Sequence, residues 1–199
     1  AVAGKEDKPI MCYRLKGGGT RSLARDYKTG EKLPVLLPLG NGFYVKDSEK
    51  RVALVGGGVG IFPLISVIRA YHKTKDIYSY MGFRNRAALC MEYDLEQSKK
   101  IVLATDDGSL GYHGTAVQAF MDEYDDVKPD VVLACGPVPM LRALKEALKD
   151  KDIPVYVSLE ERMGCGIGAC LVCVCEKTNG AHARVCKDGP VFEIRDVVL

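Results

Sequence analysis

Short apolar runs alternate with longer amphipathic stretches through the middle of the chain. Five runs rich in Val, Ile, Leu and Ala predict buried strands, at residues 51–55, 76–81, 100–105, 130–135 and 154–158. Three stretches with helical spacing of apolar positions lie between them, at residues 62–72, 114–124 and 139–149. Strands that alternate with helices indicate a doubly wound α/β fold with an open parallel sheet.

The two ends of the chain differ from this central part in their sequence pattern. The first 48 residues hold strand-like pieces at 9–15 and 33–38 that glycine and proline interrupt. Pro34 and Pro38 suit turns or strand edges rather than a central strand. A cysteine-rich region forms the other end and closes on a strand-like run at 191–194. The chain therefore divides into residues 1–48, 49–158 and 159–199.

Composition limits the class of protein. A length of 199 residues allows one large or two small domains, and 28 Lys and Arg against 26 Asp and Glu give a net charge of +2. This balance argues against a nucleic-acid partner held by bulk charge, and no apolar run is long enough to span a membrane. The first residues lack both the apolar core of a signal peptide and an initiator Met, so the chain is processed or its beginning is absent. The eight Cys favour a reducing cytoplasm.

Four cysteines near the C-terminus follow a spacing typical of one kind of metal centre. Cys165, Cys170 and Cys173 have the spacing C-x4-C-x2-C, and Cys186 follows at a distance. This is the plant-type ferredoxin arrangement, in which four thiolates hold the two irons of a [2Fe-2S] cluster. Glycines in the same loop allow the backbone to wrap closely round a cluster and point N–H groups at its sulfurs; they are Gly164, Gly166 and Gly168. A cluster here would make the protein a carrier of single electrons.

Other uses of cysteine remain open. A structural zinc site also takes four Cys, but usually as two C-x2-C pairs, and this spacing supplies one such pair. A disulfide framework is disfavoured, because Cys173 and Cys175 are too close for an easy bridge. We expect Cys175 to be a packed thiol rather than a ligand, because it alternates with Cys173 along an extended segment. Scattered cysteines are by default small buried apolar residues; they are Cys12, Cys90 and Cys135.

A glycine-rich turn joins the first central strand to the first central helix. Gly56, Gly57, Gly58 and Gly60 form this turn, and Pro63 opens the helix. Such a turn lets the backbone approach a pyrophosphate, whose charge the helix N-terminus favours. A turn that requires glycine only for its own geometry would look similar, but its place at the carboxyl end of a buried strand favours a ligand site.

Three further loops with glycine follow predicted strands, at residues 82–84, 105–111 and 135–140. All of them would line the same crevice at the carboxyl edge of the sheet. Arg84 would meet a phosphate there, or is an ordinary solvated arginine. Thr105 and Ser109 would bond a ribose or phosphate, or each caps its own turn.

These motifs together resemble a known family. Gly-Gly-Gly-Val-Gly-Ile-Phe-Pro at 56–63, Thr-Asp-Asp-Gly-Ser-x-Gly at 105–111 and Cys-Gly-Pro at 135–137 occur in this order in the ferredoxin–NADP reductase-like superfamily. The C-terminal part adds Cys-Gly-Ile-Gly-Ala-Cys-x-x-Cys-Val-Cys at 165–175 and Val-Cys-Lys-Asp-Gly-Pro-Val-Phe at 185–192. From about residue 9 onward, the chain resembles the electron transfer subunits of class B dihydroorotate dehydrogenases.

The resemblance implies a site for each of three cofactors. NAD would bind the α/β domain at Gly56, Gly57, Gly58, Gly60, Pro63, Thr105, Asp106, Gly108, Ser109, Gly111, Cys135, Gly136 and Pro137. FAD would lie between this domain and an N-terminal β-barrel, at a strand followed by a Gly-Thr helix start that matches Cys12, Tyr13, Arg14, Gly19 and Thr20. Tyr13 would lie against the flavin and Arg14 would pair with its phosphates; without the resemblance, they would be an ordinary strand with an exposed Arg. The [2Fe-2S] ligands carry over as Cys165, Cys170, Cys173 and Cys186.

The chain departs from the family at two points. The family's barrel begins earlier and carries an Arg-Pro-x-Ser flavin motif, which this sequence lacks. We therefore expect a partial barrel over residues 1–48, from a fragment or a shortened variant, and FAD binding depends on what remains. Phe62 stands where the family usually has a small residue and would crowd the nicotinamide.

The resemblance also implies a function. The subunit would pass electrons from an FMN-containing dihydroorotate dehydrogenase catalytic subunit through the [2Fe-2S] cluster and FAD to NAD+. The assembly would hold two copies of each subunit. The dihydroorotate step would need no acid–base residue of this subunit. Glu160 and Glu161 would approach the flavin or are surface carboxylates. NAD is favoured over NADP because the crevice loops show no basic cluster for a 2′-phosphate. Two alternatives are a related subunit of a hydrogenase, sulfite reductase or NADH:ferredoxin oxidoreductase, and a zinc-stabilised nucleotide-binding regulator.

Overall fold

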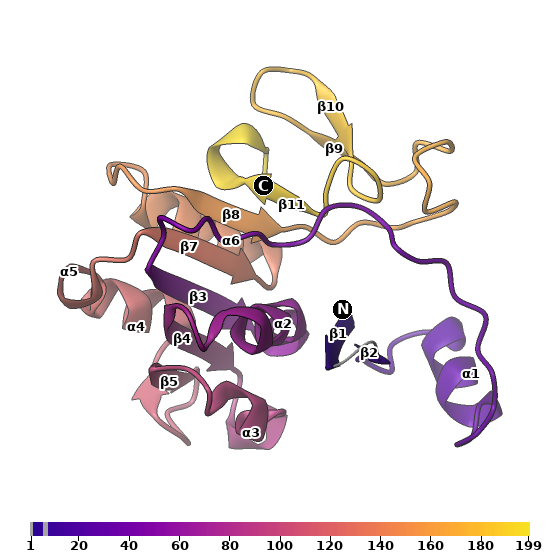
Figure 1. The fold of residues 1–199 in the computed structure, drawn as a ribbon, viewed down its shortest axis with the longest axis horizontal. Coiled ribbons are helices and arrows are strands. Elements are labelled where there is room, and N and C mark those ends of the chain that lie inside the picture. The colour runs from indigo at the N-terminus through magenta and orange to yellow at the C-terminus, as the bar shows by residue number, and fades with distance from the viewer. Residues whose placement is uncertain (1, 6–7) are drawn as a thin grey trace.

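A seven-stranded sheet forms the centre of the molecule in the computed structural model, which describes residues 2–5 and 8–199. Its order is β11-β8-β7-β3-β4-β5-β6, and Figure 1 shows most of these strands stacked one above another. The bounds are β3 Arg51–Gly57, β4 Asp76–Phe83, β5 Lys100–Thr105, β6 Tyr112–His113, β7 Val131–Cys135, β8 Val155–Ser158 and β11 Val191–Glu193. All neighbouring pairs are parallel except β11 with β8. The predicted open parallel sheet is confirmed.

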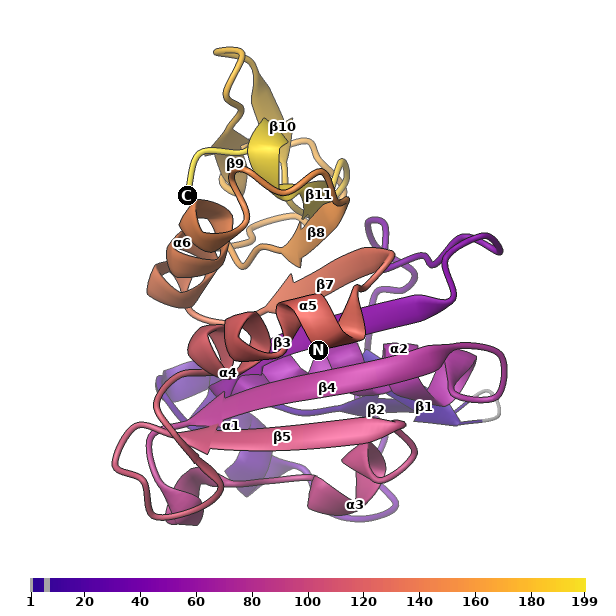
Figure 2. The same ribbon diagram turned by 90° about the vertical axis from the view of Figure 1, so that its left-hand side faces the viewer.

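Helices cover both faces of the sheet, because side chains along the central strand alternate between two apolar cores. Val52 and Leu54 pack into the core that includes α2 (Ile61–Tyr71), with α3 (Glu92–Leu95) beside it. Ala53 and Val55 pack into the opposite core. That face is covered by α4 (Ala116–Asp122), α5 (Tyr124–Val127) and α6 (Val138–Ala147), which lie in front of the sheet in Figure 2.

Local sequence accounts for the helix ends. The helix expected at 62–72 begins one residue earlier, and the one at 139–149 begins at Val138. The stretch expected at 114–124 is instead two short helices, α4 and α5, which are interrupted at Glu123. Thr115 and Gln118 form the capping box that starts α4. None of the described helices has the length and apolar character that crossing a bilayer requires.

The N-terminal part does not confirm a partial barrel. Its described residues form a hairpin of β1 (Val2–Lys5) and β2 (Lys8–Met11), then α1 (Gly18–Asp26), which buries no residue. The strand expected at 33–38 is wrong, because this segment has no regular secondary structure and pairs with no strand of the described chain. Pro34 and Pro38 cannot donate ladder hydrogen bonds, and Val35 remains 62% exposed.

The C-terminal part is tied to the sheet. A second hairpin joins β9 (Val174–Glu176) to β10 (His182–Arg184) and projects at the top of Figure 1. After it, β11 returns to extend the sheet beyond β8, and a 3-10 turn (Ile194–Asp196) follows. The region that carries the four cysteines of the predicted cluster therefore rests against the edge of the α/β sheet.

Candidate functional site

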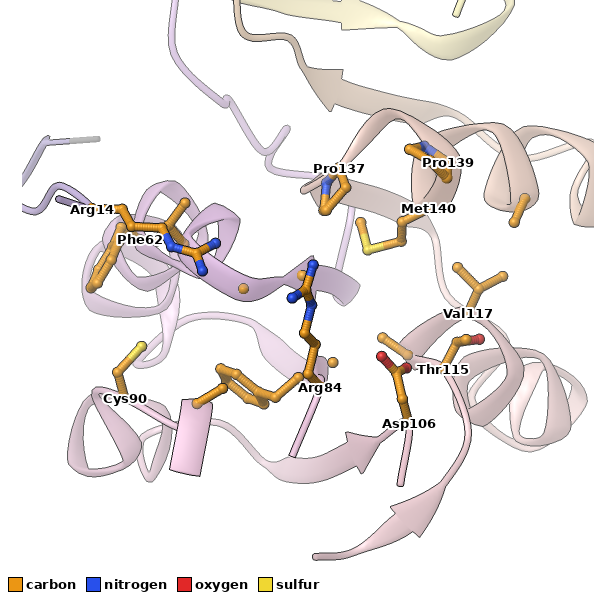
Figure 3. A pocket seen from close by; sticks show the side chains of 18 of the residues that line it. Arg14, Phe62, Arg84, Cys90, Asp106, Thr115, Val117, Pro137, Pro139 and Met140 are labelled. Carbon is orange, nitrogen blue, oxygen red and sulfur yellow. The ribbon is translucent and has the colours of Figure 1, made fainter. Parts of the chain in front are cut away.

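A cavity of about 740 Å³ opens at the carboxyl edge of the sheet, and we call it the crevice (Figure 3). Its walls come from the ends of β3, β4, β5 and β7, from α4 and α6, and from the N-terminal segment. The lining residues are Tyr13, Arg14, Gly57, Gly58, Val59, Phe62, Gly82, Phe83, Arg84, Ala88, Cys90, Asp106, Thr115, Ala116, Val117, Pro137, Pro139, Met140 and Ala143. All the loops predicted to line one crevice therefore contribute to it.

The glycine-rich turn forms the back of the crevice. Gly57 and Gly58 line it, and Gly58 has a φ of +55°, which favours glycine. Gly56 lies deeper, where a β-carbon would meet the Met81 sulfur at 2.6 Å. Gly60 packs against the Cys135 backbone. The turn (Gly58–Gly60) leads directly into α2, whose N-terminal end faces the same edge of the sheet.

Asp106 is the residue of the Thr105–Gly111 loop that lines the crevice. The buried Thr105 hydroxyl donates to the Leu110 carbonyl at 2.7 Å, and the Ser109 hydroxyl accepts the Arg86 N–H at 2.9 Å. The Thr105 hydroxyl thus bonds within its own loop, as in the turn-capping alternative, whereas the Ser109 hydroxyl joins this loop to the one after β4. The Ser109 hydroxyl and N–H also lower the pKa of the exposed Asp107 carboxyl. Gly108 and Gly111 have positive φ angles and turn this loop back to β6.

The loop after β7 closes the upper wall. Pro137 lines the crevice and caps α6, and Gly136 fits between Met140 and the Gly57 backbone. Cys135 is 2% exposed. Burial, with the nearby Glu160 charge, raises the pKa of the Cys135 thiol to about 11. This cysteine is a neutral thiol behind the crevice wall at neutral pH.

The N-terminal segment supplies the remaining wall. Tyr13 and Arg14 line the crevice, and Figure 3 shows the Arg14 guanidinium pointing into it beside Phe62. Cys12 packs at the border of the α2-side core, as does Cys90. Burial and the neighbouring Cys12 raise the pKa of the Cys90 thiol.

The Gly-Thr helix start lies at the beginning of α1, outside the crevice. The Thr20 hydroxyl accepts the Lys16 N–H at 3.0 Å and the Gly17 N–H at 3.3 Å, and so fixes the first turn of α1. Gly19 and Thr20 do not line the crevice among the described residues, nor does Pro63, which lies in the first turn of α2. The crevice itself therefore gathers Tyr13 and Arg14 with the predicted NAD loops.

The four predicted cluster cysteines meet in pairs. The Cys165 sulfur accepts the Ala169 N–H at 3.3 Å. N–H groups of Cys170, Ile167 and Ala169, with a hydrogen bond from the Cys170 side chain, lower the Cys165 pKa to about 6. The Cys186 N–H donates to the Cys173 sulfur at 3.4 Å. The pKa of Cys186 is raised, first by its hydrogen bond with Cys173 and then by burial, and the charge of Cys165 contributes. The two pairs are adjacent in the chain, since only two residues separate Cys170 from Cys173.

The loop between these pairs provides the room that a cluster requires. Gly168 has a φ of +81°, and its N–H partly offsets the raised pKa of Cys186. A β-carbon on Gly164 would lie 3.1 Å from the Cys170 sulfur. Among the described residues, no three Cys, His, Asp or Glu side chains converge as on a single ion. Two cysteine pairs, N–H groups aimed at sulfur and glycine between them fit a [2Fe-2S] cluster, which takes two thiolates at each iron.

Cys175 lies apart from this arrangement. It is in β9, opposite Ala183, and packs in the small core beneath the loop at 9% exposure. Burial raises the pKa of its thiol. Its expected role as a packed, non-ligand thiol remains a prediction that its position supports.

Comparisons with known proteins agree with both sites. Residues 160–198 match the family model for the iron-sulfur cluster binding domain of dihydroorotate dehydrogenase B, and residues 54–146 match an oxidoreductase NAD-binding domain. The dihydroorotate dehydrogenase B (NAD(+)) electron transfer subunit of Geobacillus kaustophilus is 42% identical over 98% of this chain and 76% of that protein. The corresponding subunit of Bacillus pumilus is 41% identical over 100% of this chain and 77% of its own length. This chain belongs to the family of dihydroorotate dehydrogenase B electron transfer subunits.

The fold of this electron transfer subunit is found in a related redox protein. The structure of an NADH-dependent reduced ferredoxin-NADP oxidoreductase, determined in work on flavin-based electron bifurcation, superposes with a TM-score of 0.80 and 28% identity. The match covers 94% of this chain and 67% of that chain. The ferredoxin–NADP reductase-like α/β fold expected from the motifs is therefore confirmed, and the subunit is an oxidoreductase component.

Two features of the subunit's sites had no signal in the sequence. Thr115, Ala116 and Val117 line the crevice because β6 turns the chain back so that α4 begins at its edge. Residues 36–41 lie beside the region that carries the four cysteines, where the Leu36 and Leu39 side chains lie against Gly166. The Asn41 N–H donates to the Gly189 carbonyl at 2.6 Å, and the Asn41 side chain donates to the Lys187 carbonyl. The Asn-Gly pair at 41–42 indicates only a turn.

Proposed function

We propose that this subunit carries electrons between an FMN-containing dihydroorotate dehydrogenase catalytic subunit and NAD+, using a [2Fe-2S] cluster and FAD. When bound, the cluster supplies one-electron transfer, and the flavin supplies exchange between one-electron and two-electron carriers. The observation that carries this proposal is the pairing of the four cysteines in a glycine-rich loop, on a chain whose α/β domain has a dinucleotide-sized crevice.

Cys165, Cys170, Cys173 and Cys186 hold the cluster. The sulfurs of Cys165 and Cys173 accept backbone N–H groups, which stabilise negative charge on a thiolate. The cysteine region would then lie against the catalytic subunit, because its loop is at an end of the molecule (Figure 1). We propose two copies of each subunit in the assembly.

NAD occupies the crevice. The Gly57–Gly58 backbone and the N-terminus of α2 would face its pyrophosphate, and Asp106 and Pro137 would line the rest of the site. The other predicted NAD residues hold the walls in position without lining the crevice. They are Gly56, Gly60, Pro63, Thr105, Gly108, Ser109, Gly111, Cys135 and Gly136. Phe62 at the crevice edge limits how deeply the nicotinamide enters.

FAD binds on the side of the N-terminal segment. Tyr13 and Arg14 share the crevice with the NAD loops, so a flavin held there would lie next to a nicotinamide. Cys12, Gly19 and Thr20 belong to the same segment and shape its backbone. We propose that residues 1–48 are part of a flavin-binding barrel, residues 49–158 the NAD domain, and residues 159–199 the cluster subdomain.

No acid–base catalyst is required of this subunit. Dihydroorotate is oxidised on the partner, and the crevice needs only to position cofactors and exclude water. None of the eight cysteines forms a disulfide, which suits a reducing compartment, and we propose that the complex works in the cytoplasm.

Anaerobic purification with the catalytic subunit tests the proposal. We expect the two subunits to co-purify, with two irons and two acid-labile sulfides per chain. Dihydroorotate should then reduce NAD+ only when both subunits are present. A colourless protein with one zinc would overturn the proposal in favour of a nucleotide-binding regulator. A cluster-bearing chain that reduces NAD+ only with a different redox partner would identify a related flavin and iron–sulfur subunit instead.

A further inference from the structure

Arg84 is a charged group in the crevice whose role the family motifs leave undefined. It follows directly after β4, whose Gly82 is the register partner of Gly57 in β3. The guanidinium therefore emerges beside the glycine-rich turn, and Figure 3 shows it rising into the crevice from the strand below.

The backbone on both sides of Arg84 is fixed. The Phe83 carbonyl accepts the Asp106 N–H at 3.1 Å, and the Asn85 side chain accepts the Ala88 N–H at 3.1 Å. The next loop is joined to this turn through Arg86, whose N–H donates to the Ser109 hydroxyl. A side chain on such a support is pre-positioned, so less conformational entropy is lost when it binds a ligand.

The charge of Arg84 is not neutralised within the protein. In the part of the chain that the structure describes, neither Arg84 nor Arg14 forms an ion pair. Their guanidinium groups point toward one another in Figure 3, and Asp106 is the crevice's carboxylate among the described lining residues. Two cations with one carboxylate near them favour anionic groups in the crevice.

We propose that Arg84 binds the pyrophosphate of NAD+ and NADH; this rests on the NAD site proposed above. The planar guanidinium can donate two parallel hydrogen bonds to phosphate oxygens. It stands next to the turn that opens α2, whose N-terminus also favours negative charge. Arg14 comes from the N-terminal segment and serves the flavin side, so each dinucleotide has its own arginine.

The test compares ligands that differ in phosphate content, measured by calorimetry on the purified holoprotein. ADP-ribose carries the pyrophosphate without the reactive nicotinamide, and adenosine carries neither. We expect Arg84→Gln to weaken ADP-ribose binding about 10- to 100-fold, because one charge-assisted contact is lost, and to leave adenosine binding within about twofold. Arg84→Lys keeps the charge without the bidentate geometry, so its affinity for ADP-ribose should lie between those of the wild type and Arg84→Gln.

Arg86→Gln is the matched control, because its side chain does not line the crevice. It should bind ADP-ribose like the wild type, and all variants should keep the same iron and flavin content. Unchanged ADP-ribose affinity in Arg84→Gln would overturn the assignment, and so would an equal loss for adenosine. A wild-type protein with a normal cluster that fails to bind ADP-ribose would instead overturn the NAD site itself.

Discussion

Gly60 packs directly against the backbone carbonyl of Cys135, with no room for a β-carbon between them. A β-carbon at position 60 would also lie 2.7 Å from the α-carbon of Gly136. This contact joins the loop after β3 to the loop after β7. The two loops form the back and upper wall of the crevice, so their separation sets its shape.

The first prediction is that Gly60→Ala opens this contact. The inserted methyl group must displace backbone, which costs about 1–3 kcal/mol of unfolding free energy. ADP-ribose should bind more weakly at the same time, because Gly58 and Pro137 move apart. Denaturant unfolding and calorimetry measure the two effects. Gly42→Ala is the control, since a β-carbon there meets no atom within 4 Å; equal behaviour of the two variants would contradict the prediction.

The second prediction separates ligand from non-ligand cysteines. Cys173→Ala should lose most of its iron and acid-labile sulfide, because the Cys173–Cys186 pair can no longer hold its iron. Cys175→Ala, two residues away and buried in the small core, should retain two irons per chain. Iron and sulfide analysis with the visible spectrum distinguishes them. Retention of a full cluster by Cys173→Ala would show that the ligand set is wrong.

The third prediction concerns Arg14 and the flavin. Arg14→Gln should bind FAD about tenfold more weakly, since a charge-assisted contact to phosphate is lost. Iron content should not change, because the cysteine pairs lie elsewhere. FAD released by heat is quantified per chain. Arg21→Gln, on the exposed surface of α1, controls for general loss of positive charge. An equal loss of FAD per chain in both variants would contradict the prediction that Arg14 contacts the flavin phosphates.

The fourth prediction is a pH-dependent contribution to stability. The Asp130 carboxylate accepts the N–H groups of Lys50 and Arg51, both at 2.8 Å, beside the Arg51 guanidinium. Burial raises the Asp130 pKa, but these N–H groups and the Arg51 charge outweigh it, so the net pKa is lowered. Asp130→Ala should therefore cost roughly 1–3 kcal/mol of unfolding free energy at neutral pH.

The sign of this effect follows from the lowered pKa. The ionised carboxylate stabilises the fold, so the difference in unfolding free energy between wild type and Asp130→Ala is complete above the unfolded pKa of about 3.9. The difference should shrink as the pH falls through that value toward the lower folded pKa. Denaturant titrations at several pH values measure it, with the exposed Asp152→Ala as control. A constant difference down to low pH would contradict the prediction.

Much of the α/β domain could be predicted from the sequence. The central strands are buried on both faces, so each reads as a continuous apolar run, and all five predicted runs became strands. The N-terminal part was harder, because its strand-like pieces bury little. Residues 33–38 have the apolar character of a strand but no partner among the described strands, and prolines remove two of their donors.

The alternation of buried strands and helices, the glycine-rich turn and the spacing of the cysteines could be read from the sequence alone, because each is a pattern of neighbouring positions along the chain. How these parts meet became visible in the folded chain. It brings Cys186 to Cys173, adds β11 to the sheet in antiparallel direction, and sets Arg14 opposite Arg84 across the crevice. Such contacts join residues far apart in the chain, and packing of whole elements rather than local spacing determines which of them form.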